Sequence, residues 1–392
     1  MKTSYQTIVI GCGGIGSAAV YWLSRRLGND VLGLEQFELG HHNGGSQDRS
    51  RIIRYIYHLD YYTSLMPHAY AAWEAVSEDA GIPIMTKTGG VIMAHADSEY
   101  ADTIRQYGNS VNVVNRPGEW LSMDELAYRY PQFRSERELT TFYHPDSGLV
   151  DPLRGNACHI ALARGYGATV LDNTPVLKIT SQNDGRGVQV QTDAGTFSCQ
   201  SLVIASGAWT NNVLAHFCTH IPLRVTQEQV TYYATSNLKK FSVGSFPVWQ
   251  WKGDTKIYGF PVYGEVATKA AIDDEGATVT PQTRTFEPNS VHEAQLRTFV
   301  DELIPGYSGP TLYTKTCLYT MPKDRNFVLS PLPEYPNVFV GVGAGHGYKF
   351  ASFLGKTLSE LAVDGETPHD IAPLSMMRSA VADADYIASY KY

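Results

Sequence analysis

A glycine-rich turn near the N-terminus constrains the fold of this chain more than any other feature. The turn Gly11–Gly16 follows a short β-branched run, Thr7–Ile10, and precedes apolar residues at helical spacing that end near Gly28. A second apolar run, Val31–Leu34, then ends at Glu35. Short β-branched runs favour strands, and apolar residues at helical spacing between the two runs favour a helix. We therefore predict one βαβ unit.

The glycines of this turn match the pattern G-x-G-x-x-G. Gly11 permits a tight turn, Gly13 lets the backbone approach a pyrophosphate, and Gly16 allows the helix to pack closely on the strand. Glu35, about 20 residues further on, can accept hydrogen bonds from ribose hydroxyls and would repel a 2′-phosphate. The sequence therefore predicts a dinucleotide without that phosphate, either NAD or FAD, against the alternative of a plain glycine-rich turn.

Later segments continue the alternation of strands and helices. Asp151–Pro152 predicts a helix start, with an N-cap and a first-turn proline, and short strands follow between Thr169 and Ala205. A strand at Val338–Val342, the glycine-rich loop Gly343–Gly347 and a further helix lie near the C-terminus. We expect a nucleotide-binding domain built from residues 1–85, 146–222 and 316–392, and a substrate domain built from residues 86–145 and 223–315.

Composition excludes several classes of partner. The chain has 31 Lys and Arg against 39 Asp and Glu, a net charge of −8, which gives no general attraction to nucleic acid or to anionic lipid. No apolar run has the length of a membrane helix, and no basic region precedes an apolar signal core. Five cysteines are too few for a disulfide framework in a chain of this length. We expect a cytoplasmic protein without a metal site.

Four dispersed motifs accompany the glycine turn: Gly45–Arg54, Ser206–Trp209, Thr316–Thr320 and Gly345–Phe350. With them the chain resembles the monomeric sarcosine oxidase and N-methyltryptophan oxidase family, within the glycine oxidase and D-amino-acid oxidase structural class. The resemblance implies FAD and an α/β (α+β) fold, in which a Rossmann-like FAD-binding domain carries an inserted substrate domain on a mostly antiparallel sheet. It also implies a monomer that oxidises a secondary amine, reduces O2 to H2O2 and takes a small-molecule substrate.

Cys317 matches the family's cysteine that forms a thioether to the 8α position of the flavin. Attack by sulfur requires a thiolate, so a nearby cation should help, and Arg51 matches the family's flavin-adjacent arginine. The alternative for Cys317 is a buried free cysteine that packs as a small apolar residue. We give that interpretation to the other four cysteines, namely Cys12, Cys158, Cys199 and Cys218.

The resemblance places three cations beside flavin and substrate. Lys269 matches the lysine that activates O2, where a fixed cation stabilises the charge that O2 gains; a surface lysine on an edge strand is the alternative. Arg54 and Lys349 match the pair that holds the substrate carboxylate through a guanidinium fork and an ammonium. A salt bridge on a helix face is the alternative for Arg54.

The remaining matches complete the expected site. Tyr258 and Tyr319 match aromatic walls of the amine pocket, and His346 matches a histidine near the pyrimidine end of the flavin. Further expected cofactor contacts are Gly14, Ile15, Gln36, Ser46, Gly207, Trp209, Gly343, Gly345, Gly347 and Lys349.

The sequence departs from the sarcosine oxidases at the pocket. Gln47 and Asp273 replace two histidines, and Asp273 can pair with Lys269 or meet a second positive group on the substrate. The bulky segment Tyr55–Asp60 replaces a glycine–acid turn, and we expect it to lie over the pocket. A larger N-methyl amino acid or a cyclic imino acid is therefore as good a substrate candidate as sarcosine.

Two alternatives keep the fold but change the function. One is a dehydrogenase that passes electrons to a quinone or a partner protein, and the other is a flavin-binding protein without turnover. A further interpretation, an NAD-dependent dehydrogenase, is the weakest because only the glycine turn suggests it.

Overall fold

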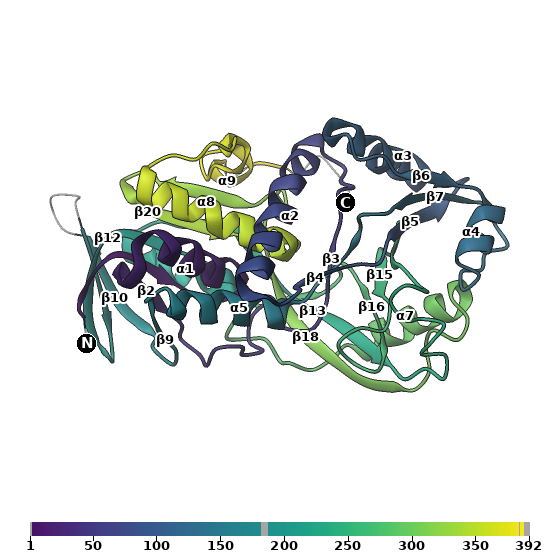
Figure 1. Ribbon diagram of the computed structural model, residues 1–392, viewed down its shortest axis with the longest axis horizontal. Coiled ribbons are helices and arrows are strands. Elements are labelled where there is room, and N and C mark those ends of the chain that lie inside the picture. The colour runs from purple at the N-terminus through teal and green to yellow at the C-terminus, as the bar shows by residue number, and fades with distance from the viewer. Residues whose placement is uncertain (1, 182–186, 384, 388–392) are drawn as a thin grey trace.

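Two large β-sheets, one covered by helices and the other mostly antiparallel, make up the fold of the computed structural model (Figure 1). The structure describes residues 2–181, 187–383 and 385–387. In Figure 1 the helix-covered sheet occupies the left half and the second sheet the right half, with helix α2 (Asp60–Ala80) between them.

The first sheet has eight strands and contains the predicted βαβ unit. Its strands are β1 (Ser4–Ile10), β2 (Val31–Leu34), β9 (Thr169–Leu171), β10 (Val176–Ser181), β11 (Val188–Thr192), β12 (Gly195–Ile204), β19 (Val328–Leu332) and β20 (Tyr335–Val342). The pairings β20–β12, β12–β1, β1–β2 and β2–β9 are parallel, whereas β10, β11 and β19 pair antiparallel. At the parallel centre, residues 7–10 of β1 and all of β2 are buried, as expected for a sheet covered on both faces.

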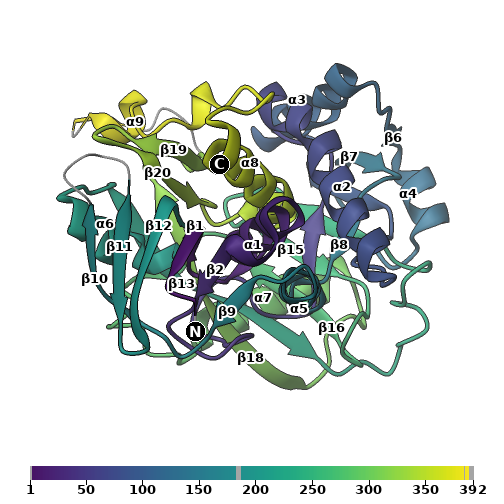
Figure 2. The same ribbon diagram turned by 60° about the vertical axis from the view of Figure 1, so that its left-hand side comes forward.

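Helices α1 (Gly14–Leu27), α5 (Pro152–Gly165) and α8 (Ala351–Asp364) pack together beside this sheet, as Figure 2 shows. Helix α5 begins as predicted, because the Asp151 side chain accepts a hydrogen bond from the backbone N–H of Arg154 at 3.0 Å. Helices α1 and α8 come so close that a Cβ on Gly355 would lie 2.5 Å from the Cβ of Ala18. Small residues thus set the spacing of the helix layer.

The second sheet has nine strands from two separate stretches of the chain. They are β5 (Gly90–His95), β6 (Glu119–Leu121), β7 (Leu139–His144), β13 (Leu223–Tyr233), β14 (Val248–Trp251), β15 (Ile257–Phe260), β16 (Thr268–Ile272), β17 (Ala277–Thr278) and β18 (Thr311–Pro322). Among its described pairings only β14–β5 is parallel. The expected fold class, with a Rossmann-like part and a mostly antiparallel sheet, is confirmed.

Shorter elements join and cover the two sheets. β3 (Arg51–Ile53), β8 (Gly148–Val150) and β4 (Met85–Lys87) form a separate three-stranded sheet with β8 in its centre. The remaining α-helices are α3 (Tyr100–Ser110), α4 (Met123–Arg129), α6 (Thr210–Leu214), α7 (Ser290–Leu303) and α9 (Ser379–Ala382). Within the described part of the chain, no helix is both long enough and apolar enough to span a bilayer.

Several expected elements differ in extent from those observed. The short strands expected between Thr169 and Ala205 include one long strand, β12, whose ten residues begin at Gly195 and whose first half pairs with β11. The expected domain boundary at residues 315 and 316 falls inside β18, which stays paired with β13 to Pro322. The division into two domains stays a prediction. The long helix α2 had no counterpart among the expected elements.

We expect Gly16→Ala to lower the free energy of unfolding by about 3 kcal/mol or more, because a Cβ there would lie 1.7 Å from the carbonyl oxygen of Gly11. Chemical denaturation measures the change. Gly165→Ala is the matched control, because a Cβ on Gly165 meets no heavy atom within 4 Å. Equal stability of the two variants would contradict the close packing of the turn.

Candidate functional site

A cavity of about 810 Å³ extends from the glycine turn after β1 to the loop after β20. Its size is in the range of cofactor and substrate sites. Most of the expected site residues line it, although they come from distant parts of the sequence. These lining residues are Gly11, Gly13, Gly14, Ile15, Glu35, Gln36, Ser46, Gln47, Arg51, Arg54, Gly207, Trp209, Tyr258, Asp273, Tyr319, Gly343, Gly345, His346, Gly347 and Lys349.

Three expected site residues do not line the cavity. Gly16 lies in the first turn of α1, where the carbonyl of Gly11 blocks the space beside it. Lys269 and Cys317 are buried in the second sheet, although Leu318 and Tyr319, next to Cys317, do line the cavity.

The glycine turn forms a cradle at one end of the cavity. Gly11 has φ +89°, in the left-handed region that favours glycine, and a Cβ there would lie 2.6 Å from the carbonyl oxygen of Ala205. The buried carboxylate of Glu35 accepts hydrogen bonds from the backbone N–H groups of Cys12 at 2.8 Å and Phe37 at 3.1 Å. These bonds fix the acid at the end of β2, beside the turn.

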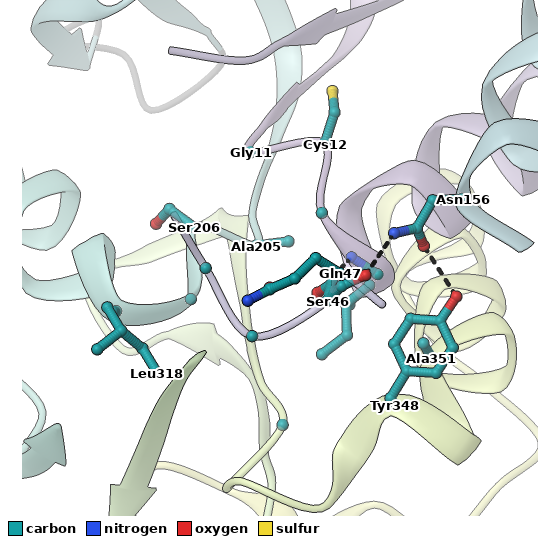
Figure 3. A pocket seen from close by; sticks show the side chains of 18 of the residues that line it. Gly11, Cys12, Ser46, Gln47, Asn156, Ala205, Ser206, Leu318, Tyr348 and Ala351 are labelled. Carbon is teal, nitrogen blue, oxygen red and sulfur yellow. Dashed lines mark hydrogen bonds between the residues drawn. The ribbon is translucent and has the colours of Figure 1, made fainter. Parts of the chain in front are cut away.

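A hydrogen-bonded chain that the sequence did not reveal supports the loop next to this cradle. Asn156 on α5 donates to the carbonyl of Ser46 at 3.0 Å, and its side-chain oxygen accepts from the hydroxyl of Tyr348 at 3.0 Å (Figure 3). Ser46 in turn accepts from the N–H of Gly14 at 2.9 Å. No pattern around Asn156 marks it, because the contact depends on how α5 packs.

Arg54 and Lys349 both line the cavity and lie against one tyrosine ring, although 349 − 54 = 295 positions separate them. The Arg54 guanidinium lies 5.1 Å and the Lys349 ammonium 5.6 Å from the ring centroid of Tyr57. The Nε and Nη1 atoms of Arg54 are buried without a hydrogen-bond partner among the described residues. Burial and the neighbouring Arg54 lower the pKa of Lys349. The pair forms a ready site for an anion.

The segment Tyr55–Asp60 does not lie over the cavity as expected, since none of its residues lines it. Tyr55, Ile56 and Tyr57 are buried, and Tyr57 packs against Arg54. The segment therefore does not cover the pocket, and its Tyr57 ring packs against the Arg54 side chain of the anion site.

Gln47 and His346 each present an unsatisfied buried polar atom. The Gln47 amide donates to the carbonyl of Thr316 at 3.1 Å, while its Oε1 has no partner among the described residues. His346 Nε2 lies 3.0 Å from the carbonyl of Arg325, and its Nδ1 likewise has no partner within the described part of the chain. Burial and the Lys349 charge lower the pKa of His346, so the ring is neutral at neutral pH. Buried polar atoms without a partner are uncommon in folded proteins, and these two belong to residues that line the cavity.

Cys317 lies on β18 directly opposite Glu228 of β13, and on the same strand face as Tyr319. Burial raises the pKa of the Cys317 thiol to about 11, although the charge of Arg51 acts in the opposite direction. Burial also raises the pKa of Glu228, to about 7. All five cysteines are free, and Cys218 is exposed, which corrects its interpretation as a buried residue.

Lys269 does not pair with Asp273. Its ammonium lies 2.6 Å from the carboxylate of Asp48 and donates to the carbonyl and the hydroxyl of Ser50 at 2.9 and 3.1 Å. The side chain is 3% exposed, so the surface alternative for Lys269 is wrong. Burial lowers the pKa of Lys269 to about 8 despite the neighbouring carboxylate.

Asp273 accepts a hydrogen bond from the Tyr319 hydroxyl at 3.3 Å and lies 3.9 Å from Arg325. Burial alone would raise its pKa, but Arg325 and the lysines Lys252 and Lys256 lower it below the ordinary value. The protein's own cations thus balance this acid, which does not favour a second positive group on the substrate.

The cavity residues fit FAD. The cradle and Glu35 suit a diphosphate and a ribose, and Gln47, His346 and Arg54 offer unsatisfied polar atoms further along the same cavity. Among the described residues no group of three or more His, Cys, Asp or Glu side chains is arranged to hold a metal.

Comparisons with known proteins agree with this assignment of the cofactor. The family model described as FAD dependent oxidoreductase matches residues 6–361. A monomeric sarcosine oxidase from Streptomyces avermitilis is 32% identical over 98% of this chain and 100% of its own. An N-methyl-L-tryptophan oxidase from Salmonella newport is 27% identical over 95% and 99%.

Among solved structures, NikD, an unusual amino acid oxidase essential for nikkomycin biosynthesis, superposes with a TM-score of 0.84. It is 24% identical and covers 95% of this chain and 98% of its own, which supports the fold. Together the family match, the full-length relatives and the fitting cavity show that this chain belongs to the FAD-dependent oxidoreductase family.

Proposed function

We propose that the protein oxidises a secondary amino acid, either an N-methyl amino acid or a cyclic imino acid, to an imine. FAD, when bound, would supply the redox chemistry: it would accept two electrons from the substrate, and O2 would take them up to give H2O2. The observation that carries the proposal is the pair of buried cations, Arg54 and Lys349, in a cavity that fits FAD. The names of the sarcosine and N-methyltryptophan oxidases that the chain resembles point to the same substrate class.

In this proposal Arg54 and Lys349 bind the substrate carboxylate. Burial and mutual repulsion weaken the charged form of Lys349, and an anion between the two side chains offsets both effects. Fixing the carboxylate orients the carbon next to nitrogen for oxidation. Tyr258 and Tyr319 then wall the pocket, and the bond from Tyr319 to Asp273 holds one wall in place.

Cys317 is the proposed point of covalent attachment. Its neighbours Leu318 and Tyr319 line the cavity, and Arg51 lies near enough to favour the thiolate. The thiol is nevertheless the main form at neutral pH, because burial outweighs that charge. Attachment is therefore expected to be slow and to follow cofactor binding.

A substrate panel tests the proposed function. N-methyl and cyclic amino acids are added without O2 to the purified protein, and we expect at least one to bleach the visible flavin absorbance. H2O2 should then form when air is admitted. A panel in which no compound bleaches the flavin would support a flavin-binding protein without turnover.

We expect Lys269→Met to slow reoxidation of the reduced enzyme by O2 about 10²-fold or more, because a fixed cation stabilises the charge that O2 gains. Stopped-flow absorbance after mixing with aerated buffer measures the rate. Lys178→Met, which removes an exposed lysine on β10, is the control and should stay close to the parent. Equal rates in all three proteins would exclude this role of Lys269.

A dehydrogenase with another acceptor is the second candidate. The observation that favours it is that Lys269 does not line the cavity and is paired with a carboxylate. Slow reoxidation of the parent enzyme in air, with fast reoxidation by a soluble quinone, would select this candidate.

A further inference from the structure

Asp48 is a buried carboxylate in the loop that joins β2 to β3. Its side chain is 2% exposed, and its backbone has φ +92°. Residues other than glycine rarely adopt that conformation, and it persists only where surrounding contacts hold it.

The contacts that hold Asp48 come from four strands. Its Oδ2 lies 2.6 Å from the Lys269 ammonium on β16 and 3.5 Å from the Arg51 guanidinium on β3. Its Oδ1 lies 3.7 Å from the Lys315 ammonium on β18 and accepts a hydrogen bond from the Tyr232 hydroxyl on β13. Asp48 is thus the anion shared by three cations.

Lys269 has no other anionic partner among the described residues. Its ammonium lies 4.5 Å from the ring centroid of Phe260 and 5.6 Å from that of Tyr232. The charged and titratable groups that face the pair from the surrounding elements are Arg51, Tyr232, Tyr313, Lys315 and Cys317.

We propose that Asp48 is a positioning residue that holds the Lys269 ammonium in place and keeps it charged at neutral pH. It thereby extends the pH range in which O2 reoxidises the enzyme. This inference rests on the proposed function, in which Lys269 is the cation that favours electron transfer to O2.

The direction of the effect follows from the charges. Burial lowers the pKa of Lys269 to about 8, and the nearby Arg51 lowers it too. Asp48 opposes them through its charge and its hydrogen bond, and Cys317 adds a smaller effect in the same direction as Asp48. Removing the carboxylate leaves burial and Arg51 in place, so the pKa falls further. The cation, and with it fast reoxidation, is then lost at a lower pH.

The first test is the pH profile of Asp48→Asn, since asparagine keeps the size of the side chain and tolerates positive φ. The reduced holoenzyme is mixed with O2 at a series of pH values. We expect the parent rate to fall with a midpoint near pH 8 and the variant rate to fall about one unit lower or more. Asp48→Gly, which also removes the backbone strain, should behave like Asp48→Asn, whereas Lys178→Met, at an exposed lysine on β10, should keep the parent midpoint.

The second test needs no turnover. Breaking a buried ion pair by removing one partner leaves an uncompensated charge, whereas removing both does not. We therefore expect the unfolding temperature of Asp48→Asn to lie below that of the double variant Asp48→Asn with Lys269→Met. The reverse order would overturn the inference.

The outcomes separate this inference from the proposed function. A parent enzyme that O2 reoxidises, with a midpoint that Asp48→Asn leaves unchanged, overturns the role of Asp48 alone. A reduced parent enzyme that O2 does not reoxidise at any pH overturns the proposed acceptor and, with it, the role of Asp48.

Discussion

Arg54→Met is expected to lower kcat/KM for the amino-acid substrate about 10²–10³-fold, because losing a buried charge-assisted partner of a carboxylate costs several kcal/mol. The two unsatisfied nitrogens of Arg54 in the parent protein are the atoms that the carboxylate would bind. Steady-state kinetics with the best compound of the panel measures the loss, after the visible spectrum has shown that the variant retains its flavin.

Arg49→Met is the matched control for this variant. Arg49 lies just before β3 and Arg54 just after it, but the Arg49 side chain is 41% exposed, does not line the cavity and pairs with Glu265 at 3.8 Å. We expect its kcat/KM to equal that of the parent. If kcat/KM of the Arg54 variant stays within about threefold of the parent value, the carboxylate site is rejected. The loss of a buried ion pair to the substrate would lower kcat/KM by more than that.

The second large effect is expected for Cys317→Ser, which should abolish covalent attachment of the flavin. Acid precipitation of the parent should leave the yellow colour in the pellet, whereas the serine variant should release it to the supernatant. The reason is that a serine hydroxyl forms far less of the anionic nucleophile than a thiol does.

Cys218→Ser is the control for the attachment experiment, because Cys218 is exposed and does not line the cavity. Its pellet should stay yellow. A colourless parent pellet would mean that the flavin is held without a covalent bond, and a yellow pellet from Cys317→Ser would place the bond elsewhere.

Local patterns determined how much of the fold could be predicted from the sequence. The turn Gly11–Gly16 and the helix start at Asp151 depend on neighbours a few residues away, so their steric and capping requirements are visible in the sequence. Helix α2 was missed, although its apolar face is buried between other helices, because no cap precedes it: Leu59 makes no side-chain cap bond.

The site was predictable only where a motif marks it. The resemblance predicted that Arg54 and Lys349 lie close together. In the structure the charged groups of both side chains lie against the ring of Tyr57. The partner of Lys269 was not predictable, because Asp48 lies 269 − 48 = 221 positions away in an irregular loop. Asn156 was missed for the same reason, since packing of whole elements creates such contacts.

A crystal structure of the purified protein tests the central claim most directly. The account predicts density for one FAD, with its diphosphate at the turn Gly11–Gly14, its ribose at Glu35, and its ring bonded to the sulfur of Cys317 and close to Lys349. Density for another molecule in this cavity, or a flavin ring remote from β18, would contradict the account.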